Sequence, residues 1–254
     1  MQKSTHLWRK GKRSWLAAGA LLFFLPSARS QDSSVSGQIE IQETVASTQP
    51  NSSHHANSPS NPVVWLVSLA DKPESPAIQR QHAPAQLVQR NKNFEPHVLV
   101  VQVGATVQFP NKDPFFHNVF SLFDGKRFDL GLYEAGSSNS VRFDRAGVSF
   151  LFCNIHPEMS AVIIAVPTPY FAVADAEGRW MIPGVPNGRY RLHVWFERSS
   201  DETLAKLQSD VVISGTGRSV QPIRIVADAA PASAHKNKYG KDYIPPATSA
   251  YSNP

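Results

Sequence analysis

Residues 147–166 read GVSFLFCNIHPEMSAVIIAV, two apolar runs joined by a short polar segment. Each run is rich in Val, Ile, Leu or Phe and has the length of a β-strand. The polar segment begins with Cys153, the only cysteine of the chain, and places His156 and Met159 three and six residues further on. The stretch therefore predicts a strand, a loop that carries a thiol, an imidazole and a thioether, and a returning strand.

Short strands are also predicted on both sides of this stretch. The strand-like segments, which are separated by turn residues, lie at 35–41, 63–69, 98–103, 106–109, 115–122, 140–143 and 189–196, and 171–180 is expected to form a hairpin with its turn around 176–178. Long stretches with the periodicity of an amphipathic helix are missing from the sequence. Several short strands at regular spacing are typical of a β-sandwich or β-barrel, so the sequence predicts an all-β fold.

Changes in composition divide the chain into six segments. We expect a signal peptide at 1–30, the first part of an accessory β-sandwich at 31–70, a linker at 71–93, a metal-binding domain at 94–166, the second part of the accessory sandwich at 167–228 and a disordered tail at 229–254. A pair of strands alone is marginally stable at best. The strands at 35–41 and 63–69 are therefore expected to share a sheet or sandwich with strands from 171–196, and the metal-binding domain is inserted into this sandwich or joined to it.

The N-terminal 30 residues have the three parts of a secretory signal peptide. A basic region without acidic residues precedes the apolar run Leu16–Leu25, and the small-residue pattern Ala28-Arg-Ser30 follows it. A helix that spans a membrane needs about 20 apolar residues, and this run is half as long. We expect cleavage after Ser30, export to the periplasm and no membrane span in the mature chain; a retained anchor is the alternative.

The charge of the chain depends strongly on this segment. The whole chain has 25 Lys and Arg residues against 20 Asp and Glu residues, with a pI near 9.4. Six of the basic residues and none of the acidic ones lie in 1–30, which leaves 19 basic against 20 acidic residues after it. A basic protein surface would suggest a nucleic-acid partner. The mature chain is close to neutral, so no such partner is expected.

Four residues are predicted to hold one metal ion: His117, Cys153, His156 and Met159. A lone cysteine in an exported chain cannot form an internal disulfide. Thiolate, thioether and imidazole donors favour copper, and two histidines and a cysteine in one plane with a weak axial methionine are typical of a type 1 (blue) copper site. The loop after the strand supplies three donors, and His117 comes from a separate loop 36 residues before the cysteine.

Other chemistries fit these residues less well than copper. Structural zinc prefers four Cys or His ligands, haem attachment needs a second cysteine, and a Cys–His nucleophile needs an orienting Asn or Asp. A buried, inert Cys153 beside unrelated His and Met residues is a further alternative. The pair His54-His55 is interpreted as part of a polar loop and His193 as a surface residue of a strand. No catalytic residue is predicted, and the chain is not expected to be an enzyme.

Three segments resemble the plastocyanin-, azurin- and amicyanin-like cupredoxins: FPNKDPFFHNVFSL (109–122), FDLGLYEAG (128–136) and CNIHPEM (153–159). The nearest group is a bacterial one described as methylamine-utilisation-like. The resemblance implies a Greek-key β-sandwich with the four donors named above as copper ligands. It also implies that Asn118 ties the two ligand loops together by hydrogen bonds.

The segments that flank this domain resemble a second kind of sandwich. VSGQIEI (35–41) is similar to the first half of a carboxypeptidase-regulatory or transthyretin-like domain, and DAEGRW (175–180) and PNGRYRL (186–192) are similar to its second half. The resemblance implies a cupredoxin domain inserted in, or joined to, a transthyretin-like β-sandwich.

The expected function is electron transfer between periplasmic redox partners, such as a cytochrome or a dehydrogenase. The intact Met159 and an apolar rim of Phe116, Ile155 and Pro157 favour this function. Copper binding and delivery without electron transfer is the alternative, and exposed tracts rich in Met or His would favour it. A scaffold sandwich with a vestigial site is a third possibility.

Overall fold

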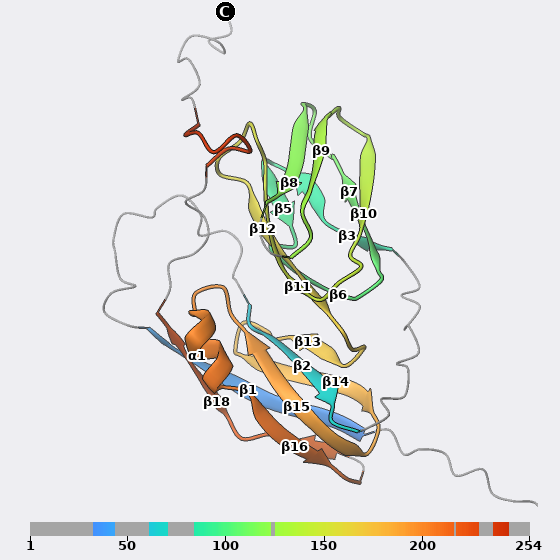
Figure 1. Ribbon diagram of the computed structural model, residues 1–254, viewed down its shortest axis with the longest axis vertical. Helices are drawn as coiled ribbons and strands as arrows, with labels where there is room; N and C mark the ends of the chain where they lie inside the picture. The colour runs from blue at the N-terminus through green and yellow to red at the C-terminus, as the bar shows by residue number, and fades with distance from the viewer. Residues whose placement is uncertain are drawn as a thin grey trace, which may run out of the picture.

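The structure, a computed structural model, describes residues 33–43, 61–70, 84–122, 125–215, 217–228 and 236–243. The predicted signal peptide, residues 1–30, and the pair His54-His55 lie outside these ranges. Within them the chain forms β-strands and one short helix, α1 (Asp201–Lys206). The prediction of an all-β protein is confirmed in this sense. The strands build two lobes that are stacked along the long axis of the molecule (Figure 1).

The first lobe, here called the site lobe, consists of the described residues from 84 to 166 and contains two sheets. The larger sheet contains, in spatial order, β6 (Val98–Gln102), β12 (Ser160–Val166), β11 (Gly147–Phe152), β8 (His117–Ser121) and β9 (Phe128–Tyr133). The smaller sheet contains β10 (Ser138–Arg142), β7 (Thr106–Pro110) and β3 (Ala85–Gln86), and the hairpin of β4 (Val88–Arg90) and β5 (Asn93–Glu95) is separate from it. Buried side chains such as Phe109, Leu151 and Ile163 form the core of this lobe.

The predicted linker 71–93 is too long at its C-terminal end, because β3, β4 and the start of β5 lie within it. β3 pairs with β7, and β4 pairs with β5. Leu87 and Gln89 are fully buried, whereas Gln86 and Arg90 are exposed. These strands have two or three residues and carry Gln and Arg. Their sequence therefore contains no apolar run that would reveal them.

The second lobe, here called the accessory lobe, combines strands from before and after the site lobe. One sheet has the order β14 (Arg179–Val185), β1 (Ser33–Glu43) and β17 (Gly217–Ser219), and β18 (Ile223–Ala227) also pairs with β1. The other has the order β13 (Phe171–Val173), β2 (Val63–Ser68), β15 (Gly188–Trp195) and β16 (Ser209–Ile213). The two early strands thus pair with later ones, as the sequence predicted for 35–41 and 63–69. The transthyretin-like character of this lobe stays a prediction.

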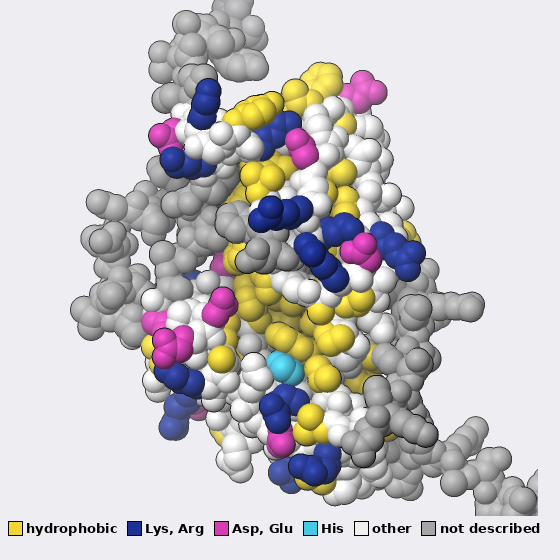
Figure 2. All heavy atoms as spheres, in the orientation of Figure 1, with side chains coloured by type: hydrophobic (Ala, Val, Ile, Leu, Met, Phe, Trp, Pro, Cys, Tyr) yellow, Lys and Arg dark blue, Asp and Glu magenta, His cyan; other side chains and the backbone are white. Residues whose placement is uncertain are grey.

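Strand β12 of the larger sheet is buried on both faces. Ile163 of β12 packs into the core of the site lobe, whereas its neighbour Ile164 belongs to a second cluster that also contains Trp195 of the accessory lobe. A strand covered on both faces needs apolar residues at every position, which explains the unbroken run 161–166. Hydrophobic side chains also gather between the lobes on the face shown in Figure 2.

Helix α1 was not predicted from the sequence, because its six residues are too few to show helical periodicity. Its start follows capping rules: the Ser200 side chain accepts a hydrogen bond from the Thr203 amide, and Asp201 and Glu202 occupy the first turn. In the part of the chain that the structure describes, no helix is long and apolar enough to cross a membrane.

Candidate metal centre

Two adjacent antiparallel strands of the larger sheet bring the predicted donors together. His117 is the first residue of β8, and Cys153 directly follows the last residue of β11. The two strands are paired through Phe120 and Phe152. Because they run in opposite directions, the start of β8 lies beside the end of β11. The loop 153–159 then leads into β12.

Three donor atoms form a compact triangle. The Sγ atom of Cys153 lies 3.8 Å from Nδ1 of His117 and 3.6 Å from Nδ1 of His156, and the two nitrogens are 3.1 Å apart. The point equidistant from the three atoms is therefore about 2 Å from each. Zinc, a metal of similar size to copper, lies roughly 2.0–2.3 Å from the imidazole nitrogens and thiolate sulfurs that bind it, so a metal ion fits at this point. The triangle has the dimensions of a metal site.

Met159 completes the set of donors predicted from the sequence. Its side chain is fully buried and belongs to the same cluster as Cys153. Two backbone bonds fold the loop: the Met159 amide donates to the His156 carbonyl at 3.1 Å, and the Cys153 amide donates to the Met159 carbonyl at 3.3 Å. The four residues form a cluster typical of a type 1 copper site, because they combine a trigonal His₂Cys set with a thioether.

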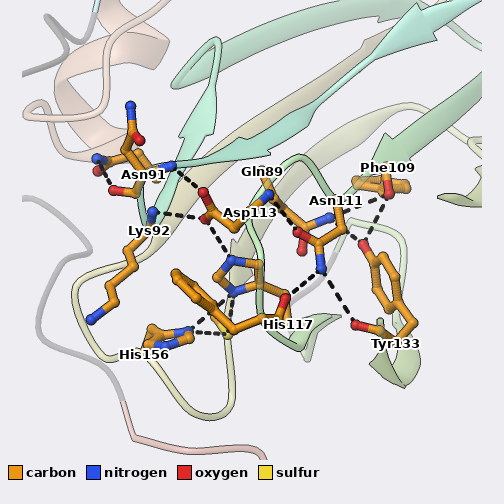
Figure 3. Close-up of polar contacts among 12 residues, drawn as sticks. Gln89, Asn91, Lys92, Phe109, Asn111, Asp113, His117, Tyr133 and His156 are labelled. Atoms are coloured by element: carbon orange, nitrogen blue, oxygen red, sulfur yellow. Dashed lines mark hydrogen bonds and ion pairs between the residues drawn. The ribbon is translucent and has the colours of Figure 1, made fainter. Parts of the chain in front are cut away.

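Asp113 is a functional residue that the sequence analysis missed. One of its carboxylate oxygens lies 2.7 Å from Nε2 of His117, and the carboxylate also accepts the backbone amides of Asn91 and Lys92, at 2.6 and 2.9 Å (Figure 3). Burial by itself raises the pKa of Asp113, but these hydrogen bonds outweigh it, so the pKa is below its ordinary value. An ionised Asp113 holds the His117 proton on Nε2 and leaves the Nδ1 lone pair for a metal.

A sequence signal for Asp113 existed, since a carboxylate lies four residues before the first histidine donor, within the turn Asn111-Lys-Asp-Pro114. Turn chemistry alone explained that aspartate equally well. Its role became visible only with the hairpin turn at Asn91 and Lys92, whose φ angles are 53° and 54°. This turn points two amides at the carboxylate.

The environment of the thiol and of the second histidine suits a metal. Burial raises the pKa of Cys153, while the backbone amides of Asn118, Ile155 and His156 oppose this by donating toward the sulfur. A metal that binds here displaces the thiol proton, and the amides stabilise the resulting thiolate. Burial and the neighbouring His117 lower the pKa of His156, which keeps its imidazole neutral and able to coordinate.

Asn118 acts differently from the role implied by the resemblance. Its side-chain amide donates to Asp129 at 2.7 Å and to the carbonyl of Gly131 at 2.9 Å, so the side chain connects β8 to β9. The backbone amide of Asn118 is the group that reaches the Cys153 sulfur. The two ligand segments are therefore linked, but through the main chain of Asn118.

The predicted apolar rim is present at the surface near the donors. Phe116 and Ile155 are 55% and 43% exposed, and Pro157 is exposed as well. The ring of Phe115 adds to this rim, with its centroid 5.6 Å from that of His156. His156 is half-buried, whereas the other three donors are fully buried. Only one donor edge thus approaches the surface.

His193 was predicted to be a surface residue of a strand and not a metal ligand. His193 lies on β15, where it stacks on Trp65 with ring centroids 5.1 Å apart, and it is not part of the donor cluster.

The tail 229–254 was predicted to be disordered, but its described residues 236–243 contact the ligand loop. The prediction was wrong for these residues, because their polar sequence reveals nothing of the partners that hold them.

Comparisons with known proteins give partial likenesses. The sequence matches no protein-family profile and no curated protein. Among solved structures, a copper-containing nitrite reductase from Thermus scotoductus is 25% identical over 33% of this chain and 22% of that chain, with a TM-score of 0.32. A purple cupredoxin from Nitrosopumilus maritimus is 24% identical over 32% of this chain and 99% of that chain, with a TM-score of 0.30.

A reduced mutant of amicyanin is 19% identical over 40% of this chain and 91% of that chain, with a TM-score of 0.31. The present chain thus spans the whole or nearly the whole of the purple cupredoxin and the amicyanin, and about a fifth of the nitrite reductase. At these TM-scores the structural similarities do not assign a family or a function to this chain. The description of the copper centre therefore depends on the donors and their geometry in this chain.

Proposed function

We propose that this chain is an exported type 1 copper protein that carries single electrons between redox partners. The observation that carries the proposal is the triangle of His117, Cys153 and His156 donor atoms, whose centre is about 2 Å from each corner. Asp113 fixes His117, and the backbone bonds of the loop fix the other donors. A site held in this way needs little rearrangement when copper changes oxidation state.

The burial of the donors favours electron transfer over copper delivery. His117, Cys153 and Met159 are fully buried, so transfer of the ion to another protein would require the loop 153–159 to open. An electron needs no such opening. The apolar rim around the half-buried His156 suits the small, weak contact that is typical of redox encounters, which bury less than about 1,200 Å².

The number of donors supports a carrier and not an enzyme. Catalytic metal sites keep a coordination position open for substrate or water. Here three donors surround one point, and the buried Met159 is available as a fourth. We propose that this set holds the copper and leaves no position for a substrate.

The location and partners are part of the same proposal. The signal peptide at 1–30 supports export to the periplasm, where an exported cytochrome or dehydrogenase would be the redox partner. Mass analysis of the N-terminus of the exported protein would test this proposal. We expect a mature chain that begins at Gln31, and a chain that keeps Leu16–Leu25 would contradict it.

The domain division is proposed with one change. We propose that the strands of 31–70 and 167–228 form one accessory sandwich and that the inserted cupredoxin-like domain starts near residue 84, ahead of residue 94. The pairing of β3 with β7 supports the earlier start. Limited proteolysis should cut within 71–83 before it cuts within 84–93, and early cleavage at Leu87 would contradict the boundary.

The copper function is tested by spectroscopy and voltammetry. Adding copper(II) to the purified chain should produce an intense visible band from thiolate-to-copper charge transfer, because Cys153 supplies the only thiolate. Cys153→Ser should lose the band completely. The bound copper should also cycle reversibly at an electrode. A colourless complex would refute the type 1 site, and a coloured complex that does not cycle would favour copper delivery.

A further inference from the structure

The C-terminal segment, residues 236–243, lies against the ligand loop although it follows the accessory lobe in sequence. The hydroxyl of Tyr243 donates to the carbonyl of Cys153 at 2.7 Å. The backbone amide of Lys238 donates to Oδ1 of Asn154 at 3.0 Å. Two neighbouring residues at the start of the ligand loop, one of them the thiol donor, are therefore bonded to this segment.

A third contact connects the segment to the strand of the other histidine donor. Nζ of Lys238 lies 2.7 Å from Oδ2 of Asp129, whose other oxygen accepts a hydrogen bond from the side chain of Asn118 at 2.7 Å. Asn118 directly follows His117 in β8. The side chain of Lys238 is 21% exposed, so this ion pair is partly shielded from solvent.

The segment has a structure of its own that presents these groups. The side chain of Asn237 accepts the backbone amides of Tyr239 and Lys241, at 3.0 and 3.1 Å, and the Gly240 amide donates to the Asn237 carbonyl at 2.9 Å. Gly240 has a φ of +72°, a conformation that glycine adopts at little cost. The resulting turn places Lys238 and Tyr243 toward the loop.

We propose that residues 236–243 position the metal centre: Tyr243 and Lys238 hold the start of the ligand loop, and through Asp129 the start of β8, in the metal-binding arrangement. The loop 153–159 is closed on itself by two backbone bonds, and its start is fixed from outside by this segment. Removing the segment frees the Cys153 carbonyl and the Asn154 side chain. The loop then opens more often, and copper leaves faster.

The proposal depends on the proposed copper function only where copper itself is measured, in the rate of copper removal and in the visible band. In the metal-free protein the same contacts should protect the amides of residues 153–159 from hydrogen exchange. This second readout tests the segment even if the chain binds no copper. A general loss of stability would speed exchange everywhere, whereas a positioning role speeds exchange at these amides more than in the rest of the site lobe.

The main experiment compares three chains that end at residues 254, 243 and 235. The chain that ends at 243 keeps the segment and is the matched control. In the chain that ends at 235, we expect a chelator to remove copper at least about tenfold faster, and the visible band to shift, because three hydrogen bonds or ion pairs are lost together. Equal rates in the chains ending at 243 and 235, together with equal exchange at 153–159, would overturn the proposal.

Point variants keep the test valid if the shortened chain does not fold. Tyr243→Phe removes one hydroxyl and should speed copper removal about fivefold, the effect of one lost hydrogen bond. Lys238→Met should act in the same direction, and Lys241→Met, at an exposed position of the same turn, is its control. If Tyr243→Phe and Lys238→Met both match Lys241→Met in copper removal and in amide exchange, the segment has no positioning role.

Discussion

Two histidines of the site lobe each pair with a carboxylate, one pair buried and the other partly buried, and the two pairs can be compared directly. Nε2 of His117 lies 2.7 Å from Asp113, and Nε2 of His97 lies 2.7 Å from Glu197 of the accessory lobe. The difference is what the other ring nitrogen meets. Nδ1 of His117 faces two metal donors, whereas Nδ1 of His97 lies 3.2 Å from the carbonyl of Ser160.

Because of this difference, the two histidine rings differ in the number of ring nitrogens that carry a proton. A carbonyl can only accept, so both nitrogens of His97 carry protons when both contacts are made. Burial by itself lowers the pKa of His97, but the hydrogen bond and charge of Glu197 outweigh it, and the pKa is raised. With both contacts made, His97 carries two protons and joins the lobes, while His117 keeps a lone pair on Nδ1 for a metal. A histidine paired with a carboxylate can therefore be a structural contact or a metal ligand. Which of the two it is depends on the group that lies beside its Nδ1 atom.

Exchanging each histidine gives the largest expected contrast. His117→Gln removes a donor, so the visible copper band should disappear and copper affinity should fall by more than the 10–100-fold typical of a residue outside the first coordination sphere. His97→Gln should keep the band. Copper titration followed by absorption measures both effects. If His97→Gln lost the band to the same extent, the two pairs would not have the separate roles assigned here.

Neutralising each carboxylate tests the pairs one step further from the metal. Asp113→Asn places an NH₂ group near Nε2 of His117 that favours a proton on Nδ1, where it competes with copper, so affinity should fall about 10–100-fold. The matched change Glu197→Gln should leave the copper dissociation constant within about threefold. Competition with a chelator of known affinity gives both values. Equal losses in the two variants would contradict the comparison.

The pH dependence of stability should arise from the His97 pair. The pKa of His97 is raised in the folded protein, so its contribution is complete below the unfolded value of about 6.5 and is lost as pH rises through the folded value. We expect about 1.5–3 kcal/mol of unfolding free energy to be lost over this range, the size of a hydrogen bond to a charged group. Urea unfolding of wild-type and His97→Gln chains at several pH values measures it. A slope that persists in His97→Gln would assign it to other groups.

The smallest expected effect concerns the turn that holds Asp113. Lys92 has a φ of 54°, which glycine adopts more readily, so Lys92→Gly should change stability by less than about 1 kcal/mol and leave copper affinity within about twofold. The backbone amide that Asp113 accepts is retained in this variant. Thermal unfolding and copper titration check the two values. A large loss of copper would show that the Lys92 side chain, which lies 5.7 Å from the Phe115 ring, contributes to the site.

The sequence by itself determined the donors and the strands around them. Cys153, His156 and Met159 lie within seven residues, so their chemistry can be read from spacing alone. The strands on both sides were visible because apolar runs are a local pattern. The pairing of early and late accessory strands could also be predicted, since two strands cannot make a core.

Only the tertiary structure decided how the donors are held. The amide of Asn91 meets Asp113 across 22 residues, and Tyr243 meets the Cys153 carbonyl across 90. Such contacts leave no periodic pattern, because one polar residue in a turn looks the same whether it faces solvent or a buried partner. The proton state of His97 depends in the same way on Glu197, which lies 100 residues away. Residue type and spacing specify the chemistry of the ligands, whereas the folded chain fixes their partners, and those partners set each proton and each lone pair.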